Sequence, residues 1–260
     1  MSSDPNRGGL LARAARALLP GGGWAAHGRG HGADEQHRPE GGLLREVVFG
    51  ANDGFVSNAA LVAAVAGGAQ DSAVVLLGGV AGLVAGAVSM GLGAYVSAKS
   101  EREFRQAEER RERWEVRHMR EDELAETRRI FEAKGISGPL LDEVVKAVAR
   151  NEERWVQVMM TDELGFPDQP PRPRLSALVM ASSFGAAAFL PVAPYLFLDG
   201  LAALAAGLGA TAAGLAAVSA WRASLTSAPM LRTSAEMIGL ASVAVAVSYG
   251  IGRLVGVSIA

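Results

Sequence analysis

The sequence predicts an all-α membrane protein with five transmembrane helices and a helical cytosolic insert between the second and the third. Half of the 260 residues are hydrophobic but only 6% are aromatic, and the apolar residues fall in long blocks instead of recurring periodically. Charged residues are nearly absent from 47–98 and from 175–221, and they are dense from 99 to 174. Because each crossing of a bilayer needs roughly 20 apolar residues, this segregation is typical of a membrane protein.

Each of five apolar segments is long enough to span a bilayer. Every backbone N–H and C=O in lipid must be paired within the protein, so we expect each segment to be a helix. The segments cover approximately 43–66, 72–98, 175–198, 200–221 and 234–257. The expected domains are therefore a disordered or amphipathic cytosolic tail over 1–42, two spans over 43–98, the insert over 99–174 and three spans over 175–260.

The distribution of Lys and Arg predicts the orientation of these helices. The tail and the insert are rich in basic residues, whereas the short loops at 67–72 and 198–200 contain none. Since cytosolic segments carry the excess of basic residues, the N-terminus and the insert are expected in the cytosol and the C-terminus outside. A short tail without a targeting signature favours a multi-pass protein of a bacterial inner membrane.

Two features of the composition restrict the chemistry and the packing. The chain has no cysteine, which excludes disulfides, thiolate metal sites and cysteine nucleophiles. Gly78, Gly82 and Gly86 recur every four residues in the second span, and small residues at this spacing let helix backbones approach closely. This stripe serves either packing within the chain or the seam of a homodimer, and the sequence leaves both open.

A carboxylate inside the first span marks a candidate site. An aspartate in hydrocarbon costs several kcal/mol unless it faces a cavity or a partner, and Asp53 occupies such a position. Asp53 follows Arg45 by eight residues and Met90 precedes Lys99 by nine, so both lie roughly 12–14 Å from the charged boundary. We therefore expect Asp53 and Met90 to share a site. A carboxylate with a thioether suits a borderline transition metal better than Mg²⁺ or Ca²⁺.

The insert is predicted to consist of charged helices. One long helix, or two with a bend, runs from Lys99 to Gly135, and another begins at Ser137 as its cap and ends near Gly165. The segment 100–165 contains 17 of the 27 acidic residues of the chain. Such an acidic segment is expected to attract divalent cations.

The spacing of the glutamates is more informative than their number. Glu112 with Glu115, and Glu123 with Glu126, are i,i+3 pairs that share a helix face. The two pairs are eleven residues apart, or about 16 Å along a continuous helix, which is too far for one ion. Either each pair binds an ion separately or the helix folds back between them.

The following helix adds two thioethers and one carboxylate within about one turn. These are Met159, Met160 and Glu163. Carboxylates with methionines, but without His or Cys, are typical of a low-affinity collecting site for Fe²⁺ or a similar ion.

Several motifs together resemble the vacuolar iron transporter family, and the similarity extends from about residue 43 to the C-terminus. The resemblance is to bacterial-type members that have a cytosolic metal-binding domain. The motifs are Phe49-Gly-Ala-Asn-Asp-Gly54, Ser89-Met90, Gly93-Ala-Tyr-Val-Ser97, Lys99-Ser-Glu-Arg-Glu103 and Met159-Met160-x-x-Glu163-Leu-Gly165.

The resemblance implies a five-helix homodimer in the lipid bilayer that exports Fe²⁺ from the cytosol, commonly in exchange for protons. Fe²⁺ and Mn²⁺ are not distinguished, and the metal is expected as transported substrate, with no permanently bound cofactor and no nucleic-acid partner. Some members carry Glu where this chain has Ala94, which leaves the proton stoichiometry open. The expected metal ligands are Asp53, Met90, Glu112, Glu115, Glu123, Glu126, Met159, Met160 and Glu163.

Two other functions compete with transport. A membrane-anchored metal sensor or buffer would bind the ion without moving it. Asp53 and Met90, which lie at matched depth inside the membrane, argue against this function. A ferritin-like di-iron enzyme needs Glu-x-x-His motifs on facing helices. The insert has a single histidine, His118, so it can form only one such motif, Glu115-x-x-His118, and lacks the second that a di-iron site needs. We therefore expect a transporter and not an enzyme.

Overall fold

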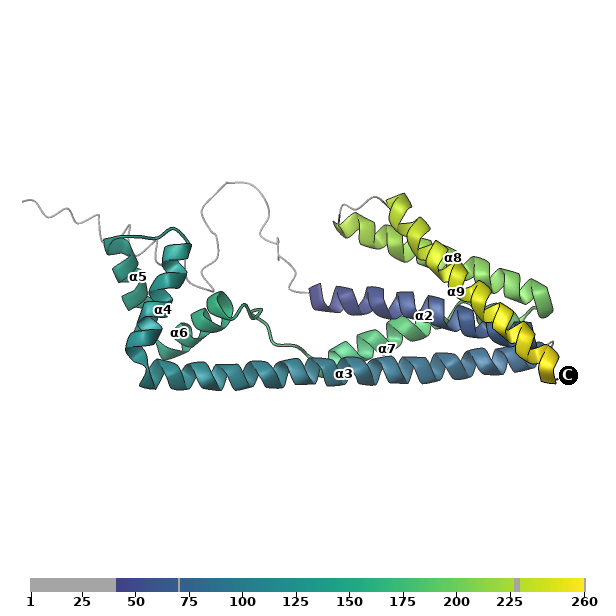
Figure 1. The fold of residues 1–260 in the computed structure, drawn as a ribbon, viewed down its shortest axis with the longest axis horizontal. Coiled ribbons are helices and arrows are strands. Elements are labelled where there is room, and N and C mark those ends of the chain that lie inside the picture. The colour runs from purple at the N-terminus through teal and green to yellow at the C-terminus, as the bar shows by residue number, and fades with distance from the viewer. Residues whose placement is uncertain (1–40, 70, 227–229, 260) are drawn as a thin grey trace, which may run out of the picture. The chain divides into compact units, whose positions relative to one another are not determined.

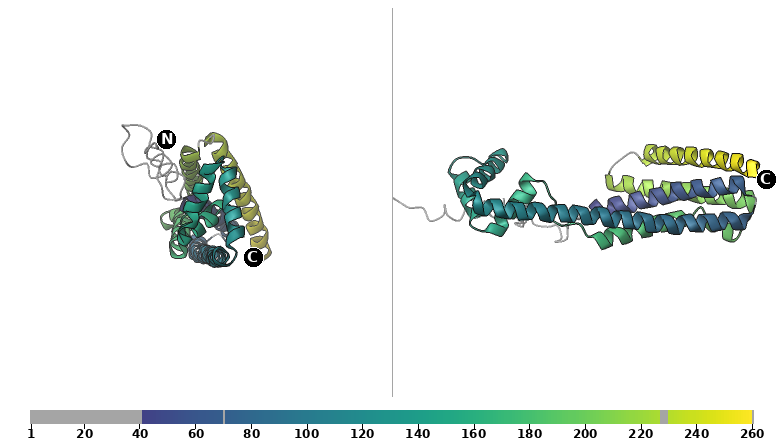
Figure 2. Two further views of the ribbon diagram at one scale, coloured as in Figure 1. Left: turned by 90° about the vertical axis from the view of Figure 1, so that its left-hand side faces the viewer. Right: turned by 60° about the horizontal axis from the view of Figure 1, so that its bottom comes forward.

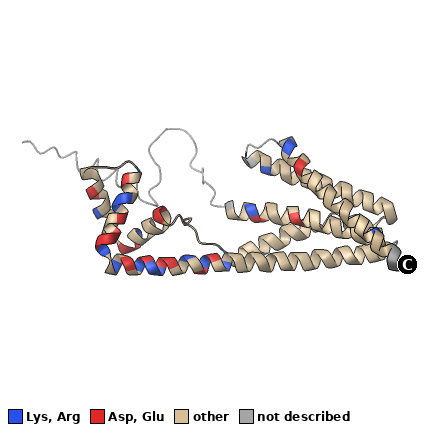
Figure 3. Cartoon of the chain, viewed as in Figure 1, with Lys and Arg blue, Asp and Glu red and all other residues tan. Residues whose placement is uncertain are grey.

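The computed structural model describes residues 41–69, 71–226 and 230–259, and nearly all of the expected 1–42 tail lies outside these ranges. Within them every regular element is helical (Figures 1 and 2). The chain divides into two compact units, of which one contains Ser100–Pro170 and the other contains Arg38–Lys99 with Pro171–Ala260. Figure 3 shows that Lys, Arg, Asp and Glu are dense in the first unit and sparse in the second, so we call them the insert unit and the membrane unit.

The membrane unit is built from four whole helices and the first part of a fifth. They are α2 (Gly41–Gly68), the beginning of α3 (Ser72–His118), α7 (Pro173–Phe189), α8 (Gly200–Thr226) and α9 (Met230–Ile259). Among the described residues, four helices are long and apolar enough to cross a membrane, namely α2, α3, α8 and α9. This confirms an all-α, multi-pass integral membrane protein.

The third predicted span is shorter than expected. α7 has 17 residues and ends at Phe189 instead of near residue 198, and the short 3₁₀ helix η2 (Ala193–Leu196) follows it. Pro191 and Pro194 explain the early end, because proline lacks the N–H of a helical hydrogen bond and disfavours helix in the residue before it. The described structure therefore has four long spans and one short apolar helix where five full spans were expected.

α2 lies at the centre of the membrane unit, where it packs against α7, α8 and α9 (Figure 1). Its Asn58 side chain is only 2% exposed. Asn58 Nδ2 donates hydrogen bonds to the carbonyl oxygens of Gly79 in α3, at 3.2 Å, and of Ala188 near the end of α7, at 2.6 Å. Interhelical hydrogen bonds of this kind stabilise helix association in membranes, so Asn58 joins three segments of the bundle.

The glycine stripe of α3 packs within the chain. A Cβ atom at Gly82 would lie 2.3 Å from Leu61 of α2, and one at Gly86 would lie 2.3 Å from the ring of Phe184 of α7. A Cβ at Gly78 would also meet a side chain of α2. Of the two interpretations left open by the sequence, packing within the chain is the one that the structure supports. Other positions of α3 expose Leu77, Val80, Val84, Val88 and Leu92.

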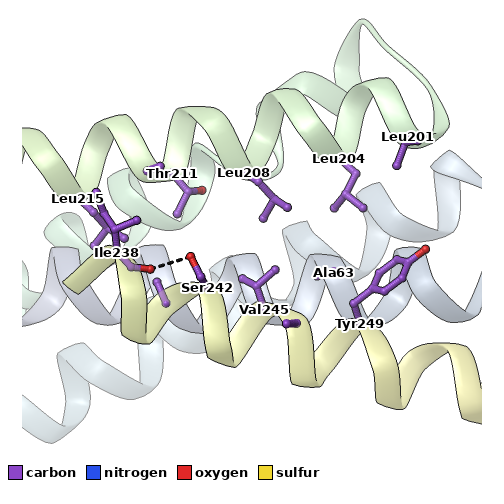
Figure 4. Close-up of a pocket in the computed structure, with 13 residues that line it drawn as sticks. Ala63, Leu201, Leu204, Leu208, Thr211, Leu215, Ile238, Ser242, Val245 and Tyr249 are labelled. Atoms are coloured by element: carbon purple, nitrogen blue, oxygen red, sulfur yellow. Dashed lines mark hydrogen bonds between the residues drawn. The ribbon is translucent and has the colours of Figure 1, made fainter. Parts of the chain in front are cut away.

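A cavity of about 480 Å³ lies between α8 and α9 (Figure 4). Of its three hydroxyl groups, those of Thr211 and Ser242 are satisfied within their own helices, since Thr211 donates to the carbonyl of Gly207 and Ser242 to that of Ile238, each at 2.8 Å. The described residues that line it include no carboxylate, histidine or methionine. The cavity therefore offers space to an apolar molecule and no ligand to a metal ion.

The insert unit contains the end of α3, then α4 (Arg120–Ala133), α5 (Pro139–Ala149), α6 (Glu152–Val158) and the π-helical turn η1 (Met159–Glu163). These elements enclose a hydrophobic core. Its largest fully buried side chains include Phe131, Trp155, Met159, Val116 and Val148.

Two breaks divide the predicted helices of the insert. The chain bends at Met119, where φ is −120° and ψ is 41°, so the first helix is two helices with a bend. The single helix expected from Ser137 to near Gly165 is wrong, because it is interrupted at Asn151. Asn151 Oδ1 accepts a hydrogen bond from the N–H of Arg154 at 2.9 Å and starts α6 as its N-cap. The residue that caps α5 is Gly138, with φ of 65°, and not Ser137.

Candidate metal site

The bend at Met119 brings the two predicted glutamate pairs together. Glu112 and Glu115 lie near the end of α3 and Glu123 lies in the first turn of α4, and one carboxylate oxygen of each lies within 4.8 Å of the other two. Oxygens bound to one small divalent ion at roughly 2.1 Å are at most about 4.2 Å apart. Three oxygens around one such ion are about 3.0–3.6 Å apart when they are equally spaced, so a contraction of roughly 1–2 Å would let all three bind it. Of the two arrangements left open by the spacing, the structure shows the chain folded back between the pairs.

Two of these carboxylates are almost completely buried. The exposed fraction is 2% for Glu112 and 4% for Glu123. The Oε2 atom of each is shielded from solvent and has no hydrogen-bond partner in the part of the chain that the structure describes. An ionised carboxylate buried without a partner is strongly unfavourable, so this pair requires protons or a cation.

The protonation behaviour of the glutamates shows that they form one electrostatic cluster. Burial, followed by the negative charges of Glu163 and Glu115, raises the pKa of Glu112 from 4.5 to about 7. Burial and the charge of Glu112 raise the pKa of Glu123 to about 7 as well. Glu163 lies at the surface, yet partial desolvation and the charges of Glu126 and Glu115 raise its pKa too. Repulsion between like charges disfavours ionisation of these carboxyl groups, and a bound cation relieves that repulsion.

Arginine side chains lie on the outer side of this glutamate cluster, which consists of the five glutamates predicted as ligands. Arg111 Nε lies 3.5 Å from Glu115 Oε2, and Arg111 Nη2 lies 3.8 Å from Glu112 Oε1. Arg129 Nη2 donates to Glu126 Oε1 at 3.0 Å. Two arginines beside five carboxylates leave the cluster negative when it is ionised. The sequence did not single out Arg111, because Glu–Arg pairs one turn apart are common on solvated helices.

Met159 and Met160 lie in the core of the insert unit, with exposed fractions of 0% and 3%. The Met159 sulfur is 3.7 Å from Thr127 Oγ1, which accepts a hydrogen bond from Trp155 Nε1 at 2.7 Å. Both methionines belong to the π-helical turn η1, and such turns are frequent at functional sites. Thr127 and Trp155 were not predicted, since no spacing in the sequence links them to Met159.

In the membrane unit, Asp53 and Met90 lie on two helices that both contact α7. Asp53 is half-buried and adjoins Gly54, where a Cβ would lie 2.4 Å from the carbonyl oxygen of Phe184 in α7. Met90 is half-buried and adjoins Gly91, where a Cβ would lie 3.0 Å from α7. The helices that carry the two residues therefore both pack against α7 next to them, and the sharing of one ion by Asp53 and Met90 stays a prediction.

Comparison with known proteins adds to this geometry. The family model described as the VIT family matches residues 44–253. Vacuolar iron transporter 1 of Oryza sativa subsp. japonica is 36% identical over 201 residues, which cover 76% of each chain. Vacuolar iron transporter 1 of Arabidopsis thaliana is 36% identical over 165 residues, covering 63% of this chain and 66% of its own. The vacuolar iron transporter of Toxoplasma gondii is 37% identical over 156 residues, covering 59% and 52%.

Proposed function

Because this chain belongs to the VIT family, we propose that it exports Fe²⁺ or Mn²⁺ from the cytosol in exchange for protons. Its relatives are named as iron transporters, so the chain is a membrane transporter of metal ions and not an enzyme. In this proposal the metal is the cargo and not a resident cofactor. The glutamate cluster of the insert gathers the ion, and Asp53 with Met90 carries it through the membrane unit.

The observation that carries the proposal is a pair of buried carboxylates, each with one oxygen that has no partner among the described residues. Glu112 and Glu123 each keep one shielded oxygen unsatisfied by any described residue, within reach of Glu115. A structural ion-pair network would place an arginine or lysine at these oxygens, whereas Arg111 reaches only the outer side. An arrangement of this kind favours a cation that arrives and leaves, which is the requirement for collecting cargo.

Three finer parts of the proposal concern the location, the assembly and the counter-ion of the transporter. The excess of Lys and Arg in the tail and the insert favours a cytosolic location for both. Exposed aliphatic side chains on α3, such as Leu77, Val84 and Leu92, would be covered in a homodimer or by lipid. For proton exchange, we propose that Asp53 binds a proton when the metal leaves.

His118 counts against the enzymatic alternative. Its Nδ1 lies 2.8 Å from the carbonyl oxygen of Trp114, and its ring stacks on the Trp114 ring at 4.7 Å between centroids. The one histidine of the insert is thus engaged on the surface of α3 and is not among the clustered carboxylates. A di-iron centre of the ferritin type would need histidines beside the glutamates.

Uptake by proteoliposomes tests the proposal. The wild-type protein should take up Mn²⁺ and Fe²⁺ saturably, faster with an opposing proton gradient, and Asp53→Ala should abolish this uptake. Asp199→Asn is a suitable control, because Asp199 is an exposed carboxylate just before α8. Metal binding without uptake would favour the sensor or buffer, and uptake unchanged in Asp53→Ala would contradict the proposed path.

A further inference from the structure

The contact between α2 and α7 is unusually close at two glycines of α2. A Cβ atom at Gly54 would lie 2.4 Å from the carbonyl oxygen of Phe184. A Cβ at Gly50 would lie 2.9 Å from the carbonyl oxygen of Met180 and 3.0 Å from its sulfur. The two backbones therefore nearly touch, and the Met180 thioether occupies the space where a side chain of residue 50 would begin.

Gly50 lies between two carboxylates on one face of α2. Glu46, Gly50 and Asp53 are related as i, i+4 and i+7, so they form one stripe along the helix. Glu46 and Asp53 are roughly 10 Å apart along the axis, and Gly50 is about midway. The missing side chain leaves a gap between the carboxylates, and the sulfur that fills it comes from α7.

α2 carries polar atoms without a partner four residues before and two residues after Gly50. Oε2 of Glu46 and Oδ1 of Asn52 are both shielded from solvent and have no hydrogen-bond partner in the described ranges of the chain. Met180 itself is only 8% exposed. Glu46 precedes Gly50, where the Met180 sulfur lies, by about one helical turn, so a sulfur and an unpartnered oxygen follow each other along this face of α2. Asn52, two residues after Gly50, projects from another face of the helix.

We propose that Met180 is a metal ligand of the transport path, and that Glu46, Met180 and Asp53 form successive steps for the ion between α2 and α7. This inference rests on the proposed function and names a site within it. Carboxylates alone bind Mg²⁺ and Ca²⁺ as readily as Fe²⁺, whereas a thioether favours the softer transition metals. Met180 thus contributes selectivity against the abundant hard cations, at a point before Asp53.

The alternative role for Met180 is packing, which methionine often performs in irregular spaces. Leucine has a similar volume and would preserve packing at little cost, but it has no donor atom. Met180→Leu therefore separates the two roles. The matched control is Leu178→Met, which adds a thioether to the exposed side of α7, where Leu178 is 67% exposed.

The experiment compares initial rates of Co²⁺, Fe²⁺ and Mn²⁺ uptake by full-length wild type, Met180→Leu and Leu178→Met in proteoliposomes, with Mg²⁺ as competitor. We expect Met180→Leu to lower kcat/KM roughly tenfold for Co²⁺ and Fe²⁺, less for Mn²⁺, and to increase inhibition by Mg²⁺. Leu178→Met should behave as wild type. Equal rates in Met180→Leu and wild type for every metal, or one uniform decrease for all metals, would overturn the inference.

A second measurement covers the case in which Met180→Leu perturbs folding. X-ray absorption at the Co²⁺ edge, in protein carrying Met90→Leu, Met159→Leu and Met160→Leu, should show sulfur scattering that disappears when Met180→Leu is added. Persistence of the sulfur signal would contradict the inference. Absence of any uptake by wild type would instead refute the proposed function, so the two failures are distinguishable.

Discussion

Glu112 of α3 and Glu123 of α4 are eleven residues apart in the sequence, yet their carboxylate oxygens lie within 4.8 Å of each other. Each has one oxygen that is buried without a hydrogen-bond partner among the described residues. The metal-free insert therefore contains two repelling carboxylates in a poorly hydrated position. Because ionisation of this pair opposes folding and a bound cation reverses the effect, metal binding and the stability of the insert are coupled.

Glu112→Gln should weaken metal binding while it stabilises the metal-free protein. The substitution keeps the shape of the side chain and removes the buried charge, and one unit of pKa shift corresponds to about 1.4 kcal/mol. We expect Mn²⁺ affinity to fall at least about tenfold and the metal-free free energy of unfolding to rise by about 1–3 kcal/mol at pH 7.5. Titration calorimetry and thermal unfolding provide the measurements.

The matched control for this substitution is Glu109→Gln. Glu109 lies on the same helix and pairs with Arg113 at 2.9 Å, outside the glutamate cluster. It should change neither quantity by more than about 0.5 kcal/mol. A Glu112→Gln protein that binds Mn²⁺ normally, or that is less stable than wild type without metal, would contradict the role assigned to the cluster.

The stability of the metal-free protein should decrease as the pH rises from about 5 to about 7.5. The pKa values of Glu112 and Glu123 are about 7 in the folded state and 4.5 in the reference state. Between these values the folded state binds more protons, so the free energy of unfolding falls with rising pH. Added Mn²⁺ should stabilise the protein increasingly over the same range, because the metal displaces those protons.

Two carboxylates outside the glutamate cluster lose their protons in a lower pH range. Hydrogen bonds from Arg128 and Arg117 lower the pKa of Asp142 and Glu152, respectively. Their stabilising contribution is lost only in acid, below their ordinary pKa range, so it does not obscure the change above pH 5. Thermal unfolding at pH 5.5 and 7.5, for wild type and Glu112→Gln with Glu123→Gln, checks the prediction. An equally steep pH dependence in the double variant would refute it.

The segregation of charge was sufficient to predict helices, membrane spans and the position of the insert in the sequence, because lipid restricts the backbone to few structures. The early end of α7 could also have been predicted from Pro191 and Pro194. The bend at Met119 could not, since neither Gly nor Pro marks it and the core around Trp155 stabilises it. Periodicity along one helix therefore identified the glutamates as candidate ligands but did not show how many ions they bind.

Contacts between helices were the least predictable part of the candidate site. Thr127 beside Met159, and Met180 beside Gly50, depend on how the helices pack. Spacing rules relate residues on one helix and carry no information about the residue that faces them from another. Gly50 was visible in the sequence only as part of a family motif.

Thr127→Val should disturb the Met159 thioether with little change in volume. The hydroxyl of Thr127 accepts from Trp155 at 2.7 Å and lies 3.7 Å from the Met159 sulfur. Its loss leaves the buried indole N–H without an acceptor, which should cost about 1–3 kcal/mol of stability. We also expect a shift in Trp155 emission and a several-fold loss of Co²⁺ affinity. Thr127→Ser keeps the hydroxyl and should restore all three properties, whereas equal behaviour of the Val and Ser variants would contradict the network.

The close contact of α2 with α7 gives a prediction with an internal control. In Gly54→Ala the new Cβ would lie 2.4 Å from the carbonyl oxygen of Phe184, so the helices must separate. Gly93 lies in the middle of α3 with no described atom within 4 Å of its Cβ position. We expect Gly54→Ala to lower the unfolding temperature by several degrees and to reduce metal uptake, since Asp53 moves with the helix.

Gly93→Ala should be neutral or stabilising by up to about 1 kcal/mol, because alanine favours helix over glycine. Thermal unfolding of both variants in detergent, followed by uptake in proteoliposomes, compares the two positions under identical conditions. If Gly54→Ala and Gly93→Ala had equal effects on stability, helix propensity and not the contact with α7 would explain the effect at residue 54. The site at Asp53 would then not depend on the distance between α2 and α7.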